Sequence, residues 1–178
     1  TLNVETRIVD DNDQPVPAGV VGEIVHRSPQ LILGYYKDPE KTAEAFRNGW
    51  FHSGDLGRMD DEGYLFVVDR KKDMIKTGGE NVASREVEEV IFHHPDVAEV
   101  AVFGVPHPTW IEAVTAIVVP KPASVVTPDQ LSQYCRKHLA GFKSPKHFDI
   151  VTDLPRNASG KILKRDLREQ YQTVFSQV

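Results

Sequence analysis

The chain is organised around one stretch, Leu154-Pro-Arg-Asn-Ala-Ser-Gly-Lys-Ile-Leu-Lys-Arg165. A proline ends the element before it, and Asn157, Ser159 and Gly160 indicate a loop whose backbone can approach a ligand closely. Lys161 follows at the end of this loop, and its mobile ammonium group suits a phosphate. A solvated turn before a C-terminal helix has the same residue pattern, so the loop alone does not decide between these two readings.

Length and composition are those of an ordinary globular protein. The 178 residues fit one medium domain or two small ones, with 40% hydrophobic and 26% charged residues. No apolar run approaches the roughly 20 residues that span a bilayer. The first residues lack an initiator methionine and a signal-peptide pattern and read as mid-strand, so we expect a piece of a longer polypeptide. Cys135 is the only cysteine, which excludes an internal disulfide and favours a cytoplasmic setting.

The net charge of −5 is unevenly distributed. Residues 1–68 contain six Lys and Arg against twelve Asp and Glu, whereas residues 69–178 contain fifteen against fourteen. Basic residues cluster at 70–76 and 136–168. The electrostatic field from these charges is too weak for a general nucleic-acid binder, so no nucleic-acid partner is expected. The clusters suit a small polyanion such as a nucleotide, or they are solvated faces.

The first part of the chain predicts mainly strands. Residues 2–9 alternate apolar and polar side chains, which is typical of a half-buried strand. Asp38-Pro39 is a helix start, and that helix is expected to end near Phe46. Further strands are expected at 22–27, 56–59 and 64–68. These features favour a small β-rich unit or barrel.

The charged run Asp69-Arg-Lys-Lys-Asp73 interrupts this pattern. We interpret it as an exposed connector or hinge and place a domain boundary between residues 69 and 70. The second part mixes both element types, with a helix from Ser84, a capping box at 127–130 and a terminal helix. Strands are expected at 97–103, 113–119 and 148–151. The whole chain is therefore predicted to be α+β, with Cys135 packed in a core.

Asp55 is the first candidate binding residue. It follows Ser53-Gly54 in residues 50–56, which we interpret as a turn that leaves Asp55 at a strand entrance. A carboxylate there can accept two hydrogen bonds from the vicinal diol of a ribose. A turn aspartate that caps its own backbone is the alternative.

Seven motifs in this order and spacing resemble the adenylate-forming superfamily of acyl-CoA synthetases, firefly-type luciferases and peptide-synthetase adenylation domains. The motifs are Gly22-Glu-Ile, Gly34-Tyr-Tyr, Gly49-Trp-Phe-His-Ser-Gly-Asp55, Asp69-Arg70, Gly78-Gly-Glu-Asn81, Arg85-Glu-Val-Glu88 and Pro155-Arg-Asn-Ala-Ser-Gly-Lys161. The match runs through essentially the whole chain. The wording of residues 78–88 looks most like that of bacterial fatty-acid-CoA ligases.

The resemblance implies a division of the chain and an activity. Residues 1–69 would be the last β-rich subdomain, a distorted barrel, of a large AMP-binding N-terminal domain. Residues 70–178 would be the small mobile C-terminal domain, a short sheet flanked by helices. The family activates a carboxylic acid with ATP and Mg²⁺ to an acyl-adenylate and transfers the acyl group to CoA. Its phosphate loop and acyl pocket would lie upstream, so we expect this chain alone to be inactive.

The resemblance also implies roles for individual residues. Asp55 would bind the ribose hydroxyls with help from Arg70. Lys72 and Asp73 would form the hinge on which the C-terminal domain moves between the two half-reactions. Lys161 would be the catalytic lysine that bridges the acid and the α-phosphate, and a protein acetyltransferase acting on it would remove the charge that this step needs.

For CoA, the resemblance implies a pantetheine channel along Gly78 and Gly79, with Trp110 nearby and Lys143 and Lys146 at the CoA phosphates. The chain departs from the family at Ile111, where the family often has glycine. A carrier-protein acceptor, luciferase-like oxidation and a non-catalytic nucleotide-binding module remain alternatives. No metal ligands are expected. The acid, the oligomeric state and any association with a membrane surface are left open.

Overall fold

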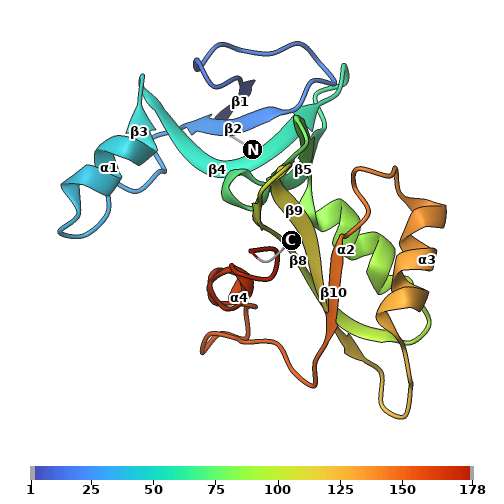
Figure 1. Cartoon of the computed structure of the whole chain (residues 1–178). Coiled ribbons are helices and arrows are strands. Elements are labelled where there is room, and N and C mark those ends of the chain that lie inside the picture. Colours follow the sequence, from blue (N-terminus) through green and yellow to red (C-terminus); the bar gives the residue numbers. More distant parts are fainter. Residues whose placement is uncertain (1–2, 177–178) are drawn as a thin grey trace. The chain divides into compact units, whose positions relative to one another are not determined.

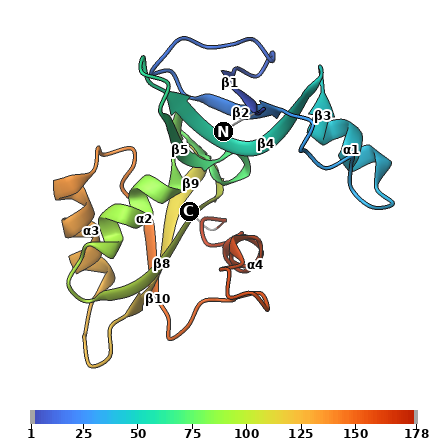
Figure 2. The same ribbon diagram turned by 180° about the vertical axis from the view of Figure 1, so that it is seen from behind.

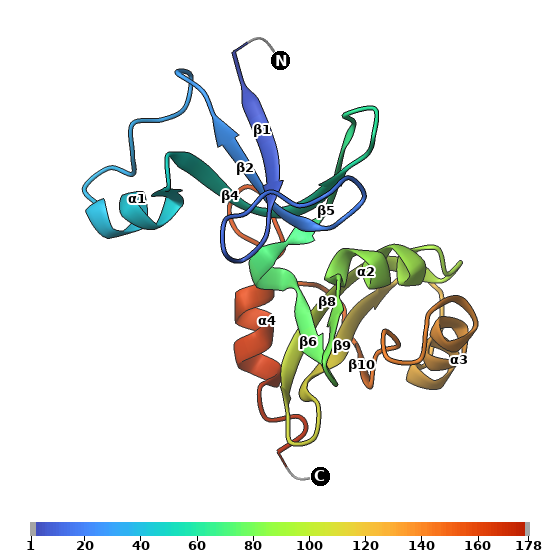
Figure 3. The ribbon, with the colours of Figure 1, turned by 90° about the horizontal axis from the view of Figure 1, so that it is seen from above.

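The computed structural model describes residues 3–176 of the chain. The chain forms two compact units, Thr1–Lys72 and Asp73–Val178. Each unit contains its own five-stranded sheet, and Figures 1, 2 and 3 show the two sheets from three directions.

The first unit is an antiparallel sheet of strand order β1-β2-β4-β3, with β5 paired to β4. A single short helix, α1, covers Pro39–Ala45, and Asp38 caps it by accepting a hydrogen bond from the Lys41 N–H. The predicted helix and the predicted strands at 22–27, 56–59 and 64–68 are confirmed. The strand predicted at 2–9 is confirmed from Glu5 onward, and residue 2 lies outside the described residues. The strands are β1 (Glu5–Val9), β2 (Gly22–Arg27), β3 (Phe46–Arg47), β4 (Trp50–Met59) and β5 (Leu65–Arg70).

The predicted turn at residues 50–56 is wrong, because β4 runs through it without a break and carries Asp55 in its interior. Gly54 lies at φ +72°, a conformation that suits glycine, and the pairing of β4 with β2 shifts register between Glu23 and Val25. Such an irregularity bends a strand while its ladder continues. Figure 1 shows β4 as the curved strand of this sheet.

The charged run at residues 69–73 is not uniformly exposed, which corrects the expectation of an exposed connector. Lys71–Asp73 form a 3₁₀ turn in which both lysines face solvent, but Asp69 and Asp73 are only 8% and 9% exposed. Asp69 accepts a hydrogen bond from the Arg70 N–H, and Asp73 accepts one from Arg168 at 2.7 Å. These donors offset the cost of burying the two carboxylates.

The second unit is built on a long antiparallel pair, β8 (Val97–His107) and β9 (Ile111–Pro120). The sheet order is β10-β9-β6-β7, with β8 on β9 and with β10 (His147–Ile150) parallel to β9. The short strands β6 (Ile75–Thr77) and β7 (Glu80–Val82) form a hairpin that the sequence did not predict. The helices are α2 (Ser84–Phe92), α3 (Pro128–His138) and α4 (Lys164–Tyr171).

Both faces of this sheet are buried, which explains the near-continuous apolar runs of β8 and β9. Val100 and Val102 point to the core under α2 and α3, whereas Ala101, Phe103 and Val105 point to the core under α4. Figure 1 and Figure 2 show α4 on one side of the sheet and α2 and α3 on the other. The predicted α+β class is confirmed, as are the strands at 97–103, 113–119 and 148–151.

Two local predictions in this unit are also confirmed. Thr127 and Gln130 form the capping box of α3. Cys135 is fully buried in the core under α3, and burial raises the pKa of its thiol to about 11. Within residues 3–176, no helix combines the length and the apolarity that crossing a bilayer requires.

Ile111, at the start of β9, lies at φ +70°. A β-branched residue in this region is strained, because its Cβ approaches the backbone carbonyl. The side chain is 69% exposed, so burial of its methyl groups recovers little of that cost. The turn before β9 is therefore held in place by contacts other than those of Ile111 itself.

We expect Ile111→Gly to stabilise the chain by about 1 kcal/mol, because relief of the strain exceeds the entropy that glycine loses on folding. The midpoint of thermal unfolding should rise by roughly 2–4 °C. Val125→Gly is a matched control, since Val125 is exposed, β-branched and outside the positive-φ set. Val125→Gly should lower the midpoint of thermal unfolding. A decrease of the same size in Ile111→Gly would contradict the strain at Ile111.

Candidate functional site

Lys161 lies at the end of a loop that the Asn157 side chain holds closed. The Asn157 Oδ1 accepts hydrogen bonds from the backbone N–H groups of Ser159 (3.0 Å) and Lys161 (2.9 Å). The Gly160 N–H donates to the Asn157 carbonyl, and Gly160 adopts φ +82°. The Lys161 side chain is exposed, and its ammonium has no hydrogen-bond or ion-pair partner among residues 3–176. The loop therefore has an ordered backbone and an available cation.

Arg156 connects this loop to the sheet, a role that sequence reasoning missed. Its Nη1 donates to the Gly160 carbonyl at 2.8 Å, and its Nη2 is paired with the Glu99 carboxylate of β8. Glu99 and Arg156 are separated by 57 residues, so no local pattern could reveal the pair.

Asp55 and Arg70 are brought together as the sequence analysis required. They are direct partners in the register of β4 and β5, and the Arg70 Nε lies 3.5 Å from the Asp55 Oδ1. The Asp55 side chain remains 38% exposed. An accessible carboxylate beside a guanidinium can accept hydrogen bonds from a ligand while its charge stays balanced.

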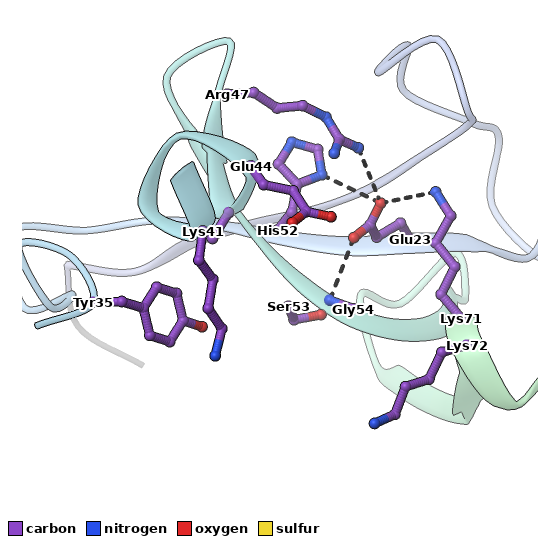
Figure 4. A pocket seen from close by; sticks show the side chains of 11 residues that line it. Glu23, Tyr35, Lys41, Glu44, Arg47, His52, Ser53, Gly54, Lys71 and Lys72 are labelled. Carbon is purple, nitrogen blue, oxygen red and sulfur yellow. Dashed lines mark hydrogen bonds and ion pairs between the residues drawn. The ribbon is translucent and has the colours of Figure 1, made fainter. Parts of the chain in front are cut away.

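Glu23 lines a cavity of about 570 Å³ together with Gly54 and Lys71, the chain neighbours of Asp55 and Arg70 (Figure 4). It is only 4% exposed, and its Oε2 lies 3.1 Å from the Lys71 Nζ and 3.3 Å from both the Arg47 Nη2 and the His52 Nδ1. Burial acts to raise the pKa of Glu23, but His52 and Lys71 outweigh it, and the pKa lies below its ordinary value.

The Glu23 cluster contacts the chain neighbours of Asp55 and Arg70. The Glu23 Oε1 accepts a hydrogen bond from the Gly54 N–H at 3.3 Å, next to Asp55, and Lys71 follows Arg70 directly. The sequence analysis noted Glu23 only as part of the Gly22-Glu-Ile motif. The lone signal was a glutamate flanked by apolar residues, Val20 and Val21 before it and Ile24 and Val25 after it, which becomes interpretable once its partners are known.

Gly78 and Gly79 form the tip of the β6–β7 hairpin. Both have positive φ angles, +59° and +88°, as a tight two-residue hairpin turn demands. The Gly78 N–H donates to the Trp110 carbonyl at 3.0 Å, which ties the hairpin tip to the start of β9.

Trp110 is the centre of a small cluster in this unit. The His107 ring stacks on its indole at 4.2 Å with planes 10° apart, and the Lys146 Nζ lies 5.3 Å from the ring centroid. The structure thus brings Gly78, Trp110 and Lys146 together. Lys143 differs, because its ammonium is paired with Glu86 of α2 at 2.7 Å.

The candidate residues are distributed over both units. Asp55, Arg70 and Lys72 belong to the first, whereas Asp73 and all those after it belong to the second. Lys72 is exposed. Among residues 3–176, no three His, Cys, Asp or Glu side chains are grouped so that they could hold a metal ion.

Comparison with known proteins identifies the fold. Residues 86–161 match the family model described as AMP-binding enzyme C-terminal domain. The chain superposes on ATP-bound MatB from Rhodopseudomonas palustris with a TM-score of 0.91 and 40% identity, covering 97% of this chain and 35% of that one.

Three curated relatives illustrate the range of similar proteins. A long-chain-fatty-acid–CoA ligase of Escherichia coli O6:H1 is 46% identical over 168 residues, covering 94% of this chain and 30% of the ligase. A feruloyl-CoA synthase of Amycolatopsis sp is also 46% identical, covering 94% and 34%. A fatty acid–[acyl-carrier-protein] ligase, ScoC of Streptomyces coeruleorubidus, is 41% identical, covering 94% and 32%.

The chain spans about a third of the length of these relatives. Over nearly all of the chain, the structural match to MatB includes both the five-stranded antiparallel sheet of the first unit and the small sheet with its helices in the second. Over nearly its whole length the chain is thus similar to the C-terminal portion of adenylate-forming enzymes, and its residues 86–161 match the AMP-binding enzyme C-terminal domain.

Proposed function

We propose that this chain is the C-terminal portion of an ATP-dependent acyl-CoA synthetase. The enzyme would convert a carboxylic acid and ATP into an acyl-adenylate and pyrophosphate, and then the acyl-adenylate and CoA into a thioester and AMP. The observation that carries this proposal is the available Lys161 ammonium at the end of an internally hydrogen-bonded loop. It lies at the end of the residues matched by the AMP-binding enzyme C-terminal domain.

Lys161 would act in the first step. The acid's carboxylate oxygen attacks the α-phosphorus, the bond to pyrophosphate breaks, and negative charge builds on the phosphoryl oxygens. An ammonium placed there stabilises the charge as it develops. Because the loop backbone is already ordered by Asn157 and Arg156, little conformational entropy is lost when the lysine is delivered.

Asp55 and Arg70 would hold the nucleotide in both steps. The ribose hydroxyls would donate hydrogen bonds to the exposed Asp55 carboxylate, which Arg70 holds in orientation from 3.5 Å away. We treat Mg²⁺ as bound with the ATP phosphates and propose no ligand for it among the described residues.

The second step would use the second unit. The thiol of CoA attacks the acyl carbonyl and AMP leaves, while the Gly78-Gly79 hairpin tip and Trp110 line the path of the pantetheine. Lys146, beside Trp110, would meet the CoA phosphates, and Lys143 would do so after exchanging Glu86 for a phosphate. We further propose Lys72 and Asp73 as the hinge between the two steps, with residues 1–69 and 70–178 as the two domains.

The acid is less well defined than the chemistry. Two relatives at the same 46% identity are named for long-chain fatty acids and for ferulate, so identity over this span does not separate these acids. The fatty-acid assignment rests on motif wording. We further propose that the protein is cytoplasmic, with or without attachment to a membrane surface. The exposed Lys161 would be the substrate of a protein acetyltransferase.

Transfer to a carrier protein is the second candidate function, favoured by the likeness to ScoC. It shares the adenylation step and differs only in the acceptor. The Trp110 and Lys146 cluster favours CoA, because a stacked indole and an ammonium match an elongated, phosphate-bearing molecule.

Lys161→Ala in the full-length polypeptide should lower acid-dependent ATP–pyrophosphate exchange by on the order of 10²–10³, as expected for one lost charge-stabilising donor. Transfer of a pre-formed acyl-adenylate to CoA should stay near the wild-type rate. Lys137→Ala, in the exposed last turn of α3, is the control and should leave both activities intact. Unchanged exchange in Lys161→Ala would show that the loop is only a surface turn.

Asp55→Asn should raise the KM for ATP by roughly 10–100-fold, since a charge-assisted hydrogen bond is replaced by a weaker neutral one. The control is Asp61→Asn in the exposed turn between β4 and β5. Initial rates at varied ATP concentration, with acid and CoA saturating, give the KM for ATP of each variant. Equal KM values for the two variants would exclude Asp55 as a nucleotide contact.

A further inference from the structure

We propose that His107 is a positioning residue for the thiol-transfer step. Through the unprotonated Nδ1 of its ring, it would hold Trp110 in the orientation that receives the CoA-like co-substrate. The inference rests on the proposed function of the Trp110 cluster, and it adds a residue that neither the family motifs nor the sequence analysis singled out.

The local sequence explains why the histidine turns back on its own chain. His107 ends β8 and pairs with Ile111, the first residue of β9, so residues 108–110 must reverse the chain. Pro108 has no N–H group, which leaves the N–H groups of Thr109 and Trp110 as the donors of this reversal. Both point at the His107 Nδ1, at 3.1 Å and 3.3 Å.

These two bonds fix the state of the ring. A ring nitrogen that accepts from two N–H groups carries no proton, so the proton of neutral His107 is on Nε2. The side chain thus supplies the acceptor that the reversal lacks, in the way that a short polar side chain caps a helix or turn.

Trp110 is consequently held at three separate points. Its N–H donates to His107, its carbonyl accepts from Gly78 at 3.0 Å, and its indole face stacks on the His107 ring. His107 makes two of the three contacts. Trp110 remains only partly buried, so part of its side chain is still available to a ligand.

The strain at Ile111 makes this restraint necessary. A β-branched residue such as Ile111 keeps a left-handed backbone conformation only where the contacts around it outweigh its own conformational preference. The reversal immediately before it is held by the His107 Nδ1. Loss of that acceptor would let residues 108–111 relax and would move the indole out of position.

The test is a reciprocal pair of variants in the full-length polypeptide. His107→Asn keeps an acceptor oxygen near the place of Nδ1 and loses the stacked ring, whereas His107→Phe keeps a ring and loses the acceptor. For each we would measure acid-dependent pyrophosphate exchange and the KM for CoA in thioester formation. We expect His107→Phe to raise the KM for CoA about tenfold and His107→Asn to stay within about twofold of wild type. Exchange should be unchanged in both.

Amide hydrogen exchange of residues 107–112 provides a readout that does not depend on activity. The Thr109 and Trp110 amides should exchange faster in His107→Phe and at the wild-type rate in His107→Asn. Impairment of His107→Asn with a normal His107→Phe would overturn the proposal, because stacking alone would then position Trp110. A loss of pyrophosphate exchange in either variant would overturn it as well.

The experiments distinguish a failure of the proposed function from a failure of the proposed role of His107. A wild-type enzyme that forms no CoA thioester refutes that function before any variant is compared. Equal amide exchange rates in the two variants refute the role of Nδ1, whatever the acceptor is.

Discussion

The antiparallel pairing of β8 with β9 is the constraint on which the second unit depends. It extends from Val97 opposite Pro120 to His107 opposite Ile111, and both of its faces are buried. Helices α2 and α4 pack on β8, β6 and β10 pair with β9, and α3 packs against β10 and α2. One end of the β8–β9 pair presents the Trp110 reversal, and Glu99 of β8 anchors the Lys161 loop through Arg156. Two loops with different proposed chemistry therefore share one rigid support, which fixes their spacing within the unit.

The second unit was largely predictable because its signals are local. Continuous apolar runs indicate strands buried on both faces, and the capping box of α3 needs only residues 127–130. Burial of Asp69 and Asp73 was not predictable, since five consecutive charged residues normally remain in solvent. Asp73 is buried because Arg168, 95 residues later, lies beside it. The curvature of β4 likewise depends on its register with β2, which no window of sequence contains.

The residues of the candidate site fall into the same two groups: those with a local sequence signal were predicted, and those defined by distant partners were not. The motifs pointed to Asp55, Arg70 and Lys161, and the structure pairs the first two across β4 and β5. The residues that hold them, Glu23 and Arg156, emerged only from their tertiary contacts. A binding residue has a preferred chemistry that sequence can show, whereas a supporting residue is defined by its partner. Lys143 illustrates the converse, because its ion pair with Glu86 was invisible in the sequence.

Chemical labelling of Cys135 can report local opening of the second unit. It is the only thiol in these 178 residues, it lies on the buried face of α3, and its pKa of about 11 keeps it protonated near neutral pH. A thiol-specific reagent can reach it only after α3 leaves the sheet, so the rate of labelling measures the free energy of that local opening. Under the proposed function, the same enclosure would separate this nucleophile from the activated acyl group and would protect the protein from acylating itself.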